Sequence, residues 1–265
     1  MKFKISIIFN TLFVFLSSLV VNCGFIDNFC NTELKGPGAI VLTFDDRNIS
    51  DWYKSDSILS KYNWKATFCV TDYGKVNEEQ KQNLLELQSI GHEIAHHGYK
   101  HFNALEYLKT NTMEEYIQNE ITPSLDLMKN DGLNITSFVY PGGVRSDALD
   151  LVLFDYFPIL RGTTYGKKPL NQQECFLEIG GDKLLVYGLG IDNHYEHFDI
   201  DYYYKLIEYA ANNGVAVIFY GHRIADDDST SYVTSYQTLE KICSYAQDKN
   251  MDFLTLRELT AYNTN

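Results

Sequence analysis

Residues 77–101 read NEEQKQNLLELQSIGHEIAHHGYKH, a helical pattern followed at once by a short apolar run. Asn77 is a typical helix N-cap, acidic residues occupy the first turn, and Gly91 is typical of the position where a helix ends. The run HEIA after Gly91 therefore begins a new element, and a repeating strand–helix pattern requires a strand there. This stretch therefore predicts a helix followed directly by a strand, as in an α/β fold.

The same alternation continues along the chain beyond residue 37. Short apolar, β-branched runs predict strands at 39–44, 65–71, 135–141, 156–163, 184–191, 215–221 and 252–256. Further helices are predicted at 55–63, 112–132, 199–214 and 231–250. Pro123 should bend or divide the second of these. Strands that alternate with helices predict a parallel sheet, open or closed into a barrel, with its active site at the carboxyl ends of the strands.

The composition limits the class of protein. The chain has 265 residues, of which 45% are hydrophobic and 22% charged, as in an ordinary globular fold. Its net charge of −13 argues against nucleic acid as a partner, because phosphate binding needs a basic surface. The 20 Tyr and 16 Phe fit a packed core or, alternatively, a surface on which sugar rings stack.

The amino-terminal segment predicts export. A positively charged start precedes a long apolar run, so we interpret residues 1–23 as a signal peptide. A short segment at 24–37 then leads into a domain at 38–262. Cys23 lies where a lipoprotein signal would carry its lipidated cysteine. The protein is therefore expected to be secreted or held at the cell surface, with membrane contact only through a lipid at Cys23 or an uncleaved signal anchor.

Four further cysteines follow Cys23. Export permits disulfides, but the pairing among these four stays open: Cys30, Cys69, Cys175 and Cys243. Cys69 lies in the strand pattern KATFCVT, which is typical of a buried residue and makes it a poor partner for a disulfide.

The histidines of GHEIAHHGYKH offer two pairs with the same spacing. His92, Glu93 and His96 match H-E-x-x-H, a zinc-protease signature that requires a helix. On the predicted strand, however, residues four apart are about 13 Å apart, too far to share one zinc ion. His97 and His101 instead come at the end of the strand, where Gly98 lets the chain turn and bring both imidazoles onto one ion.

Three other strand ends carry polar or turn residues. Asp45 and Asp46 follow the first strand, and adjacent carboxylates repel each other unless a cation or proton lies between them. FVYPGG ends another strand at Pro141 and Gly142, where a backbone N–H can approach a ligand closely, and His222 follows VAVIFYG. Each feature alone is explained by a turn, a cap or a solvated side chain. Together they indicate one site.

In this combination the sequence resembles the NodB-type polysaccharide deacetylases over residues 38–260. TFDD is similar to the family's first motif and GHEIAHHGYKH to its second, with Gly98 in place of the usual Ser or Thr. FVYPGG, YGH and the ending DFLTLREL are similar to later motifs. The resemblance implies a single catalytic domain with the fold of a distorted (β/α) barrel of about seven strands.

The resemblance also implies roles for individual residues. The ligands of a divalent metal, Zn with Co or Ni as alternatives, would be Asp46, His97 and His101. Asp45 would be the general base toward the attacking water, and His222 the general acid toward the leaving amine. The N–H of Gly142, next to Pro141, would stabilise the oxyanion together with the metal.

The sequence departs from the family's pattern at several positions. Val139 stands where an Arg is usual, so Arg145 or Arg161 would have to hold Asp45, and we favour Arg161 because it also ends a strand. GLGIDNHYEHF offers Asp192 but no Trp, so a Tyr or Phe such as Tyr195 would line the sugar.

Two further features of the expected site follow. Tyr220 replaces the Leu that usually lines the acetyl pocket. His194 and His197 are interpreted as solvated loop residues.

The sequence thus predicts a metal-dependent hydrolase that removes acetyl groups from a polysaccharide, from N-acetylglucosamine units above all. An O-acetyl esterase acting on acetylated xylan and an inactive carbohydrate-binding relative remain as alternatives.

Overall fold

The computed structural model describes residues 36–178, 180–227 and 231–262. The predicted signal peptide at 1–23 and the cysteines Cys23 and Cys30 lie outside these residues. Within them, no helix is both long and apolar enough to cross a membrane. Cys69, Cys175 and Cys243 are buried and unpaired.

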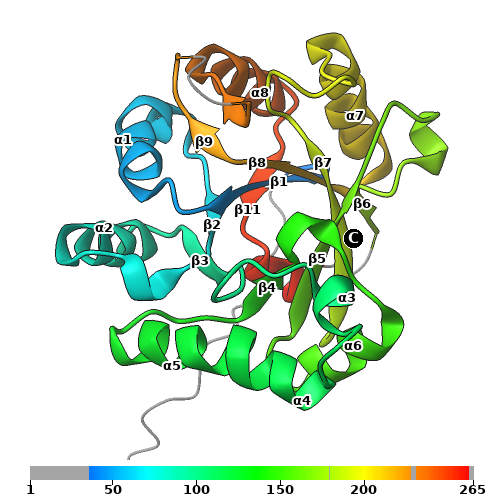
Figure 1. Ribbon diagram of the computed structural model, residues 1–265. Helices are drawn as coiled ribbons and strands as arrows, with labels where there is room; N and C mark the ends of the chain where they lie inside the picture. The colour runs from blue at the N-terminus through cyan, green and yellow to red at the C-terminus, as the bar shows by residue number, and fades with distance from the viewer. Residues whose placement is uncertain (1–35, 179, 228–230, 263–265) are drawn as a thin grey trace, which may run out of the picture. The chain divides into compact units, whose positions relative to one another are not determined.

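Seven parallel strands close into a barrel, in the order β1–β2–β3–β4–β5–β7–β8 and back to β1 (Figure 1). Their bounds are β1 Ala39–Asp46, β2 Ala66–Val70, β3 Glu93–His96, β4 Ser137–Val139, β5 Ile159–Thr164, β7 Leu184–Gly190 and β8 Ala216–Gly221. The closing pair, β8 and β1, runs in register from Ala39 opposite Ala216 to Phe44 opposite Gly221. The predicted distorted (β/α) barrel of about seven strands is confirmed.

Helices surround the barrel on its outside (Figure 1). They are α1 Ile49–Leu59, α2 Glu78–Ser89, α3 Ala104–Tyr107, α4 Met113–Tyr116, α5 Thr122–Asn130, α6 Asp147–Leu153, α7 Ile200–Asn213 and α8 Tyr236–Asp248. Asn77 caps α2 through a reciprocal capping box with Gln80, and Gly91 follows the helix at φ 105°, as the sequence predicted. The chain then enters β3, so HEIA is the start of a strand.

Short strands complete the sheet. β11, Asp252–Leu254, pairs with the first residues of β1, and β6, Phe176–Leu177, lies antiparallel against β8. β9, Arg223–Ile224, and β10, Val233–Thr234, form a separate parallel pair beyond β8.

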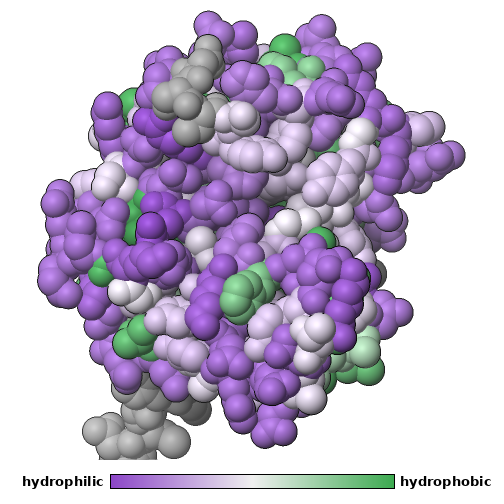
Figure 2. Space-filling model, in the orientation of Figure 1, coloured by the Kyte–Doolittle hydropathy of each residue, from purple (hydrophilic) through white to green (hydrophobic). Residues whose placement is uncertain are grey.

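The alternation of side chains along each strand separates two apolar clusters. On β1, Ala39 and Val41 join a cluster of small and branched residues inside the barrel, whereas Ile40, Leu42 and Phe44 pack beneath the helices. Hydrophobic residues on the surface are scattered rather than gathered on the face seen in Figure 2. Because the inward row of β1 continues to Asp45, that carboxylate is delivered to the carboxyl end of the barrel interior.

The amino end of the barrel is closed by a buried carboxylate. Glu93, only 1% exposed, accepts hydrogen bonds from Ser137 Oγ at 2.6 Å, Arg257 N–H at 2.7 Å, Thr67 Oγ1 at 3.1 Å and Thr136 Oγ1 at 3.2 Å. These donors come from β2, from β4 and its approach, and from the 3-10 turn Arg257–Ala261, so one side chain ties these three segments to its own strand, β3.

One helix prediction is confirmed and another needs correction. The helical segment at 112–132 is divided near Pro123, as predicted, with a π-helical turn at Ile117–Ile121 and Pro123 at the start of the helix that follows, α5. The helix predicted from residue 231 begins only at Tyr236, because Val233 and Thr234 pair with β9 instead. Helix α6 was not predicted, since it is short and follows a glycine-rich turn.

Replacing Glu93 by Ala should lower the free energy of unfolding by about 3 kcal/mol, because four hydrogen-bond donors lose a buried acceptor at once. Urea unfolding would measure the change. Glu79→Ala, on the exposed face of α2, is the control and should change stability by less than about 0.5 kcal/mol. Equal effects of the two substitutions would show that the Glu93 network does not hold the barrel end.

Candidate active site

A cavity of about 270 Å³ opens at the carboxyl ends of the barrel strands, where sites of parallel α/β barrels lie. Its lining comes from six strand ends and the loops after them: Asp45, Asp46, His97, His101, Gly142, Gly143, Thr163, Tyr165, Tyr195, Tyr220, His222 and Tyr232. Gly142 has a φ of 62°, and Pro141 beside it is buried just behind the lining. All the strand-end residues singled out in the sequence therefore lie at or next to one cavity.

Asp46, His97 and His101 form a cluster that can hold a metal ion, with one ligand atom of each within 4.8 Å of the others. Asp46 Oδ1 lies 3.5 Å from His101 Nε2 and 3.8 Å from His97 Nε2. Asp46 has a φ of 81° and His101 a φ of 57°, both in the left-handed region that non-glycine residues seldom adopt. This local turning at the strand ends is what brings the three side chains together.

The donor set fits a divalent transition metal. Two imidazole nitrogens and one carboxylate oxygen are the ligand types of catalytic zinc sites, which keep a further position open. Ligands about 2.0 Å from a tetrahedral ion lie about 3.3 Å apart, and the two distances from Asp46 Oδ1 to the histidine nitrogens, 3.5 Å and 3.8 Å, are close to that value. His97 Nδ1 bonds to the carbonyl of Val139 at 2.9 Å, which leaves Nε2 for the ion, and burial lowers the pKa of His97 to about 4. The ring is therefore neutral, as ligation requires.

Asp45 is buried and contacts Arg161, which is fully buried on β5. Val139 and Arg161 are directly paired across β4 and β5, so Arg161 presents its guanidinium beside the position where the family's motif arginine is expected. Burial alone would raise the pKa of Asp45, but the charge of Arg161 above all outweighs it and holds that pKa below its usual value. Arg145, the other candidate, pairs with Asp150 instead.

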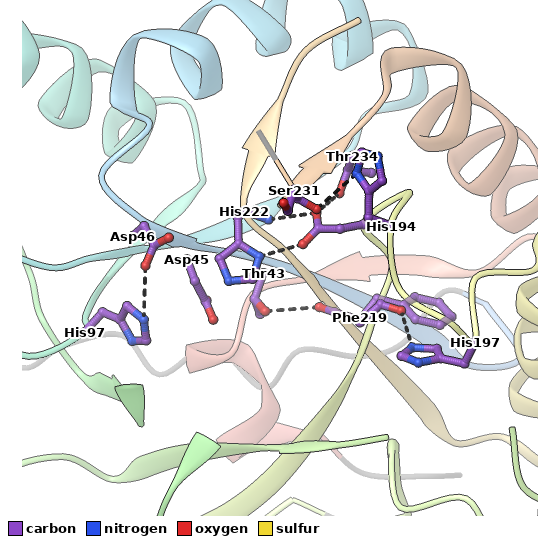
Figure 3. Close-up of polar contacts among 12 residues, drawn as sticks. Thr43, Asp45, Asp46, His97, His194, His197, Phe219, His222, Ser231 and Thr234 are labelled. Carbon is purple, nitrogen blue, oxygen red and sulfur yellow. Dashed lines mark hydrogen bonds and ion pairs between the residues drawn. The ribbon is translucent and has the colours of Figure 1, made fainter. Parts of the chain in front are cut away.

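His222 is oriented by a second buried carboxylate. Its Nδ1 lies 2.6 Å from Asp192, which also accepts hydrogen bonds from Thr234 Oγ1 at 2.7 Å and from the His222 N–H at 3.2 Å. Trp52 on α1 donates to the His222 carbonyl at 2.8 Å. Burial lowers the pKa of His222, but Asp192 and Asp45 outweigh it, and the net shift is upward. Figure 3 shows Asp45 between the Asp46–His97 pair and His222.

The partners of His222 were only partly visible in the sequence. Asp192 was singled out as the Asp of its motif, without an assigned contact, because its role depends on a hydrogen bond between the segments that follow the neighbouring strands β7 and β8. Thr234 gave no signal, since it lies in a segment that was predicted as helix.

The other histidine pair points away from the cluster. His92 accepts the Ala66 N–H on Nδ1 at 3.1 Å and meets Asp56 of α1 on Nε2 at 3.1 Å. His96 bonds through Nε2 to the carbonyl of Ile121 at 3.1 Å and to Ser124. The two rings connect β3 to different helical segments, so H-E-x-x-H does not form a metal site here.

Tyrosines form the wall and rim of the cavity. Tyr195 meets Tyr220 edge to face at 5.9 Å, and the missing side chain of Gly190 makes room for it, because a Cβ there would lie 2.4 Å from the Tyr195 ring. Tyr165 and Tyr232 are each 55% exposed on the rim, and neither was singled out in the sequence.

The two loop histidines differ from each other. His194 is exposed, as expected. The expectation for His197 was wrong: it is buried, stacks on Tyr195 at 5.1 Å and bonds to the Gly190 carbonyl. Since Tyr195 covers its face, His197 is shielded from solvent although it lies in a loop.

Comparison with known proteins gives one family match. Residues 33–155 match the family described as polysaccharide deacetylase. No curated protein sequence matches the chain.

Solved structures similar to this chain share its fold. The Xyl-CE4 domain of a multidomain xylanase from the hindgut metagenome of Trinervitermes trinervoides is 20% identical with a TM-score of 0.55, over 86% of this chain and 93% of that one. The peptidoglycan deacetylase PdaC from Bacillus subtilis is 18% identical with a TM-score of 0.54, over 84% and 89%. The chitin deacetylase of the fungal pathogen Colletotrichum lindemuthianum is 15% identical with a TM-score of 0.57, over 85% and 88%.

His101→Ala should abolish binding of a divalent metal, because it removes one of the three candidate ligand atoms, whereas His92→Ala should leave the bound metal content largely unchanged. Elemental analysis of the purified variants, after dialysis against a metal-free buffer, would measure both. If His92→Ala lost the metal while His97→Ala kept it, the ion would be held by the other histidine pair.

Proposed function

We propose that this chain, which belongs to the polysaccharide deacetylase family through its residues 33–155, removes acetyl groups from a polysaccharide by metal-dependent hydrolysis. The observation that carries the proposal is the composition of the cavity. A cluster of three metal-ligand side chains shares it with an ion-paired carboxylate, Asp45, and a carboxylate-paired histidine, His222. That is the set of groups that hydrolysis of an unactivated acyl bond needs.

Asp45 is the proposed general base. A divalent ion held by Asp46, His97 and His101, with zinc the best fit and cobalt or nickel as alternatives, would polarise the acetyl carbonyl and make a water more acidic. Asp45 is ionised because Arg161 stabilises its negative charge, and it lies one residue from the ligand Asp46. It can therefore take the proton of the attacking water, while Arg161 fixes the carboxylate in place.

His222 is the proposed general acid. Its Nδ1 is bound to Asp192, so Nε2 is the nitrogen left to face the cavity. An amine leaves only when it is protonated, and an imidazolium stabilised by a buried carboxylate is suited to supply that proton near neutral pH. This need for an acid favours an amide substrate over an ester. Gly142 lines the cavity, and its N–H is the proposed donor toward the oxyanion.

The substrate we propose is a polymer with N-acetylglucosamine units, such as chitin or peptidoglycan. The exposed rings of Tyr165 and Tyr232 offer flat faces to sugar rings at the rim. A neighbouring cavity of about 620 Å³ shares Tyr165 and Tyr195 with the first and gives room for adjoining sugars. A net charge of −13 disfavours polyanionic polymers. Export directed by residues 1–23 would bring the protein to such polymers outside the cell.

Acetate release from chitin oligomers, peptidoglycan and acetylated xylan, measured with added zinc and after chelation, tests the proposal. Zinc-dependent release from the first two substrates is expected. Release from acetylated xylan alone would make the protein an O-acetyl esterase. Binding of the polymers without any release would make it a carbohydrate-binding relative that lacks turnover.

His222→Ala should lower amide turnover by roughly a hundredfold or more, the usual contribution of a positioned acid, while zinc content persists. In the wild type, activity should persist above pH 6.5 and fall only as the pH rises through the raised pKa of His222, because the protonated form is the active one. This alkaline limb should be absent in His222→Ala.

Asp192→Asn tests the same role of His222 by changing its hydrogen-bond partner. It removes the charge that raises the pKa of His222, so the alkaline limb should move to lower pH. An unchanged limb in Asp192→Asn, or wild-type amide turnover in His222→Ala, would rule out His222 as the acid.

Arg161→Lys should lower kcat with little change in zinc content, because a lysine keeps the buried charge but loses the guanidinium N–H that bonds to Asp45 Oδ1. Single-turnover kinetics and elemental analysis would separate the two quantities. Arg145→Lys is the control, since Arg145 holds Asp150 at the start of α6 and does not contact Asp45. A larger kinetic loss in Arg145→Lys would transfer the role to that residue.

A further inference from the structure

Glu120 is a fully buried carboxylate that lies under the loop carrying His101. Its Oε2 accepts the N–H of Lys100 at 2.8 Å, and its Oε1 accepts the N–H of Phe102 at 2.8 Å. Its own backbone carbonyl accepts the N–H of Tyr99 at 2.9 Å. One residue thus binds the backbone on both sides of His101.

The segment that carries His101 needs such support more than the segment that carries His97 does. His97 directly follows strand β3, and its ring is fixed by the carbonyl of Val139. His101 comes four residues later, beyond the turn at Gly98, with a left-handed φ of 57° and a side chain that is 43% exposed. A left-handed histidine costs on the order of 1 kcal/mol or more and persists only when the surrounding contacts hold it.

Glu120 reaches the loop because its helix is locally widened. It lies in the π-helical turn Ile117–Ile121, between α4 and the Pro123-containing start of α5. Its side chain is buried while its neighbours Gln118 and Asn119 are exposed. Single π-turns inside helices are frequently found at functional sites.

Gly98 provides the space that this carboxylate occupies. A Cβ at position 98 would lie 2.4 Å from Glu120 Oε1, closer than two such atoms can approach, and the φ of +78° is itself one that glycine favours. The related motif carries a Ser or Thr at this position. The glycine and the buried glutamate are therefore complementary features of this chain.

We propose that Glu120 is a positioning residue that sets His101 for metal binding, and that Gly98 is the site that admits its carboxylate. The inference rests on the metal site of the proposed function. Glu120 is not itself a ligand and does not line the cavity. It acts through the backbone of residues 99–102, which fixes where the His101 imidazole can lie.

The test is Glu120→Gln, which keeps the shape of the side chain but offers one acceptor oxygen to two N–H donors. The Kd for zinc, measured by competition with a chelator, should rise roughly 10- to 100-fold, as is usual when support of a metal ligand is lost. In the metal-free protein, the amides of Lys100 and Phe102 should exchange hydrogen faster, while the core strands exchange as before.

Glu115→Gln is the matched control. Glu115 also accepts a backbone N–H, that of Thr112 at 2.7 Å, but it does so in the exposed capping box of α4. Its substitution should leave zinc affinity and the exchange of Lys100 and Phe102 unchanged.

A second variant, Gly98→Ala, tests whether the missing side chain at position 98 makes room for the Glu120 carboxylate. It should also weaken zinc binding, and the loss should be smaller in a Glu120→Ala background, where no carboxylate opposes the added methyl group. The strain of alanine at this φ is common to both backgrounds, so the double-mutant cycle isolates the contact with Glu120. If Glu120→Gln fails to fold, Gly98→Ala in the wild-type background decides the question, since an unchanged Kd for zinc there would overturn the inference.

The outcomes separate the inference from the proposed function. Wild-type zinc affinity in Glu120→Gln, or additive losses in the cycle, would overturn the role of Glu120 while leaving the metal site intact. A wild type that binds no zinc would instead overturn the metal site. The rates of amide hydrogen exchange at Lys100 and Phe102, measured in the metal-free Glu120→Gln variant and wild type, would still decide whether Glu120 holds the loop.

Discussion

A buried guanidinium and a buried carboxylate, Arg161 and Asp45, meet at the mouth of the barrel and connect β5 to β1. Neither charge could be removed from water alone, because an unpaired buried ion costs several kcal/mol. Their pairing makes it possible for a carboxylate to remain ionised in a site with little water. The guanidinium also lies over the ring of Tyr220 at 5.0 Å, so the same contact shapes the wall of the cavity.

The alternation of strands and helices, and the edge of the sheet that carries the site, could be predicted from the sequence because their signals are local, whereas closure into a seven-stranded barrel was implied by the family resemblance. Apolar runs end at Asp45, His97, Pro141 and His222, and parallel strands must bring their carboxyl ends to one edge. The helix boundary at Gly91 also favours His97 and His101 over the other histidine pair, because it places His92 and His96 along a strand. These predictions depend only on spacing along the chain and on the geometry of a strand.

Other features of the site depend on contacts across the fold and had no local signal. His197 follows a polar loop pattern, yet it is covered by Tyr195. Glu120 lies in an ordinary helical pattern, and only the π-helical turn directs it inward. Val233 and Thr234 are helix-compatible in sequence but pair with β9 instead. In each case a tertiary contact overrides the local preference.

The pairing of Val139 with Arg161 has a consequence for how such proteins are compared. The guanidinium that holds Asp45 is defined by its place in the barrel and comes here from the strand next to the one expected. If Arg161 has the proposed role, either of two neighbouring strands can supply this residue to the same carboxylate at the barrel mouth. A motif scan that requires the arginine at its usual place in the chain would class such a protein as inactive. A comparison of positions in space would recognise the two arrangements as equivalent.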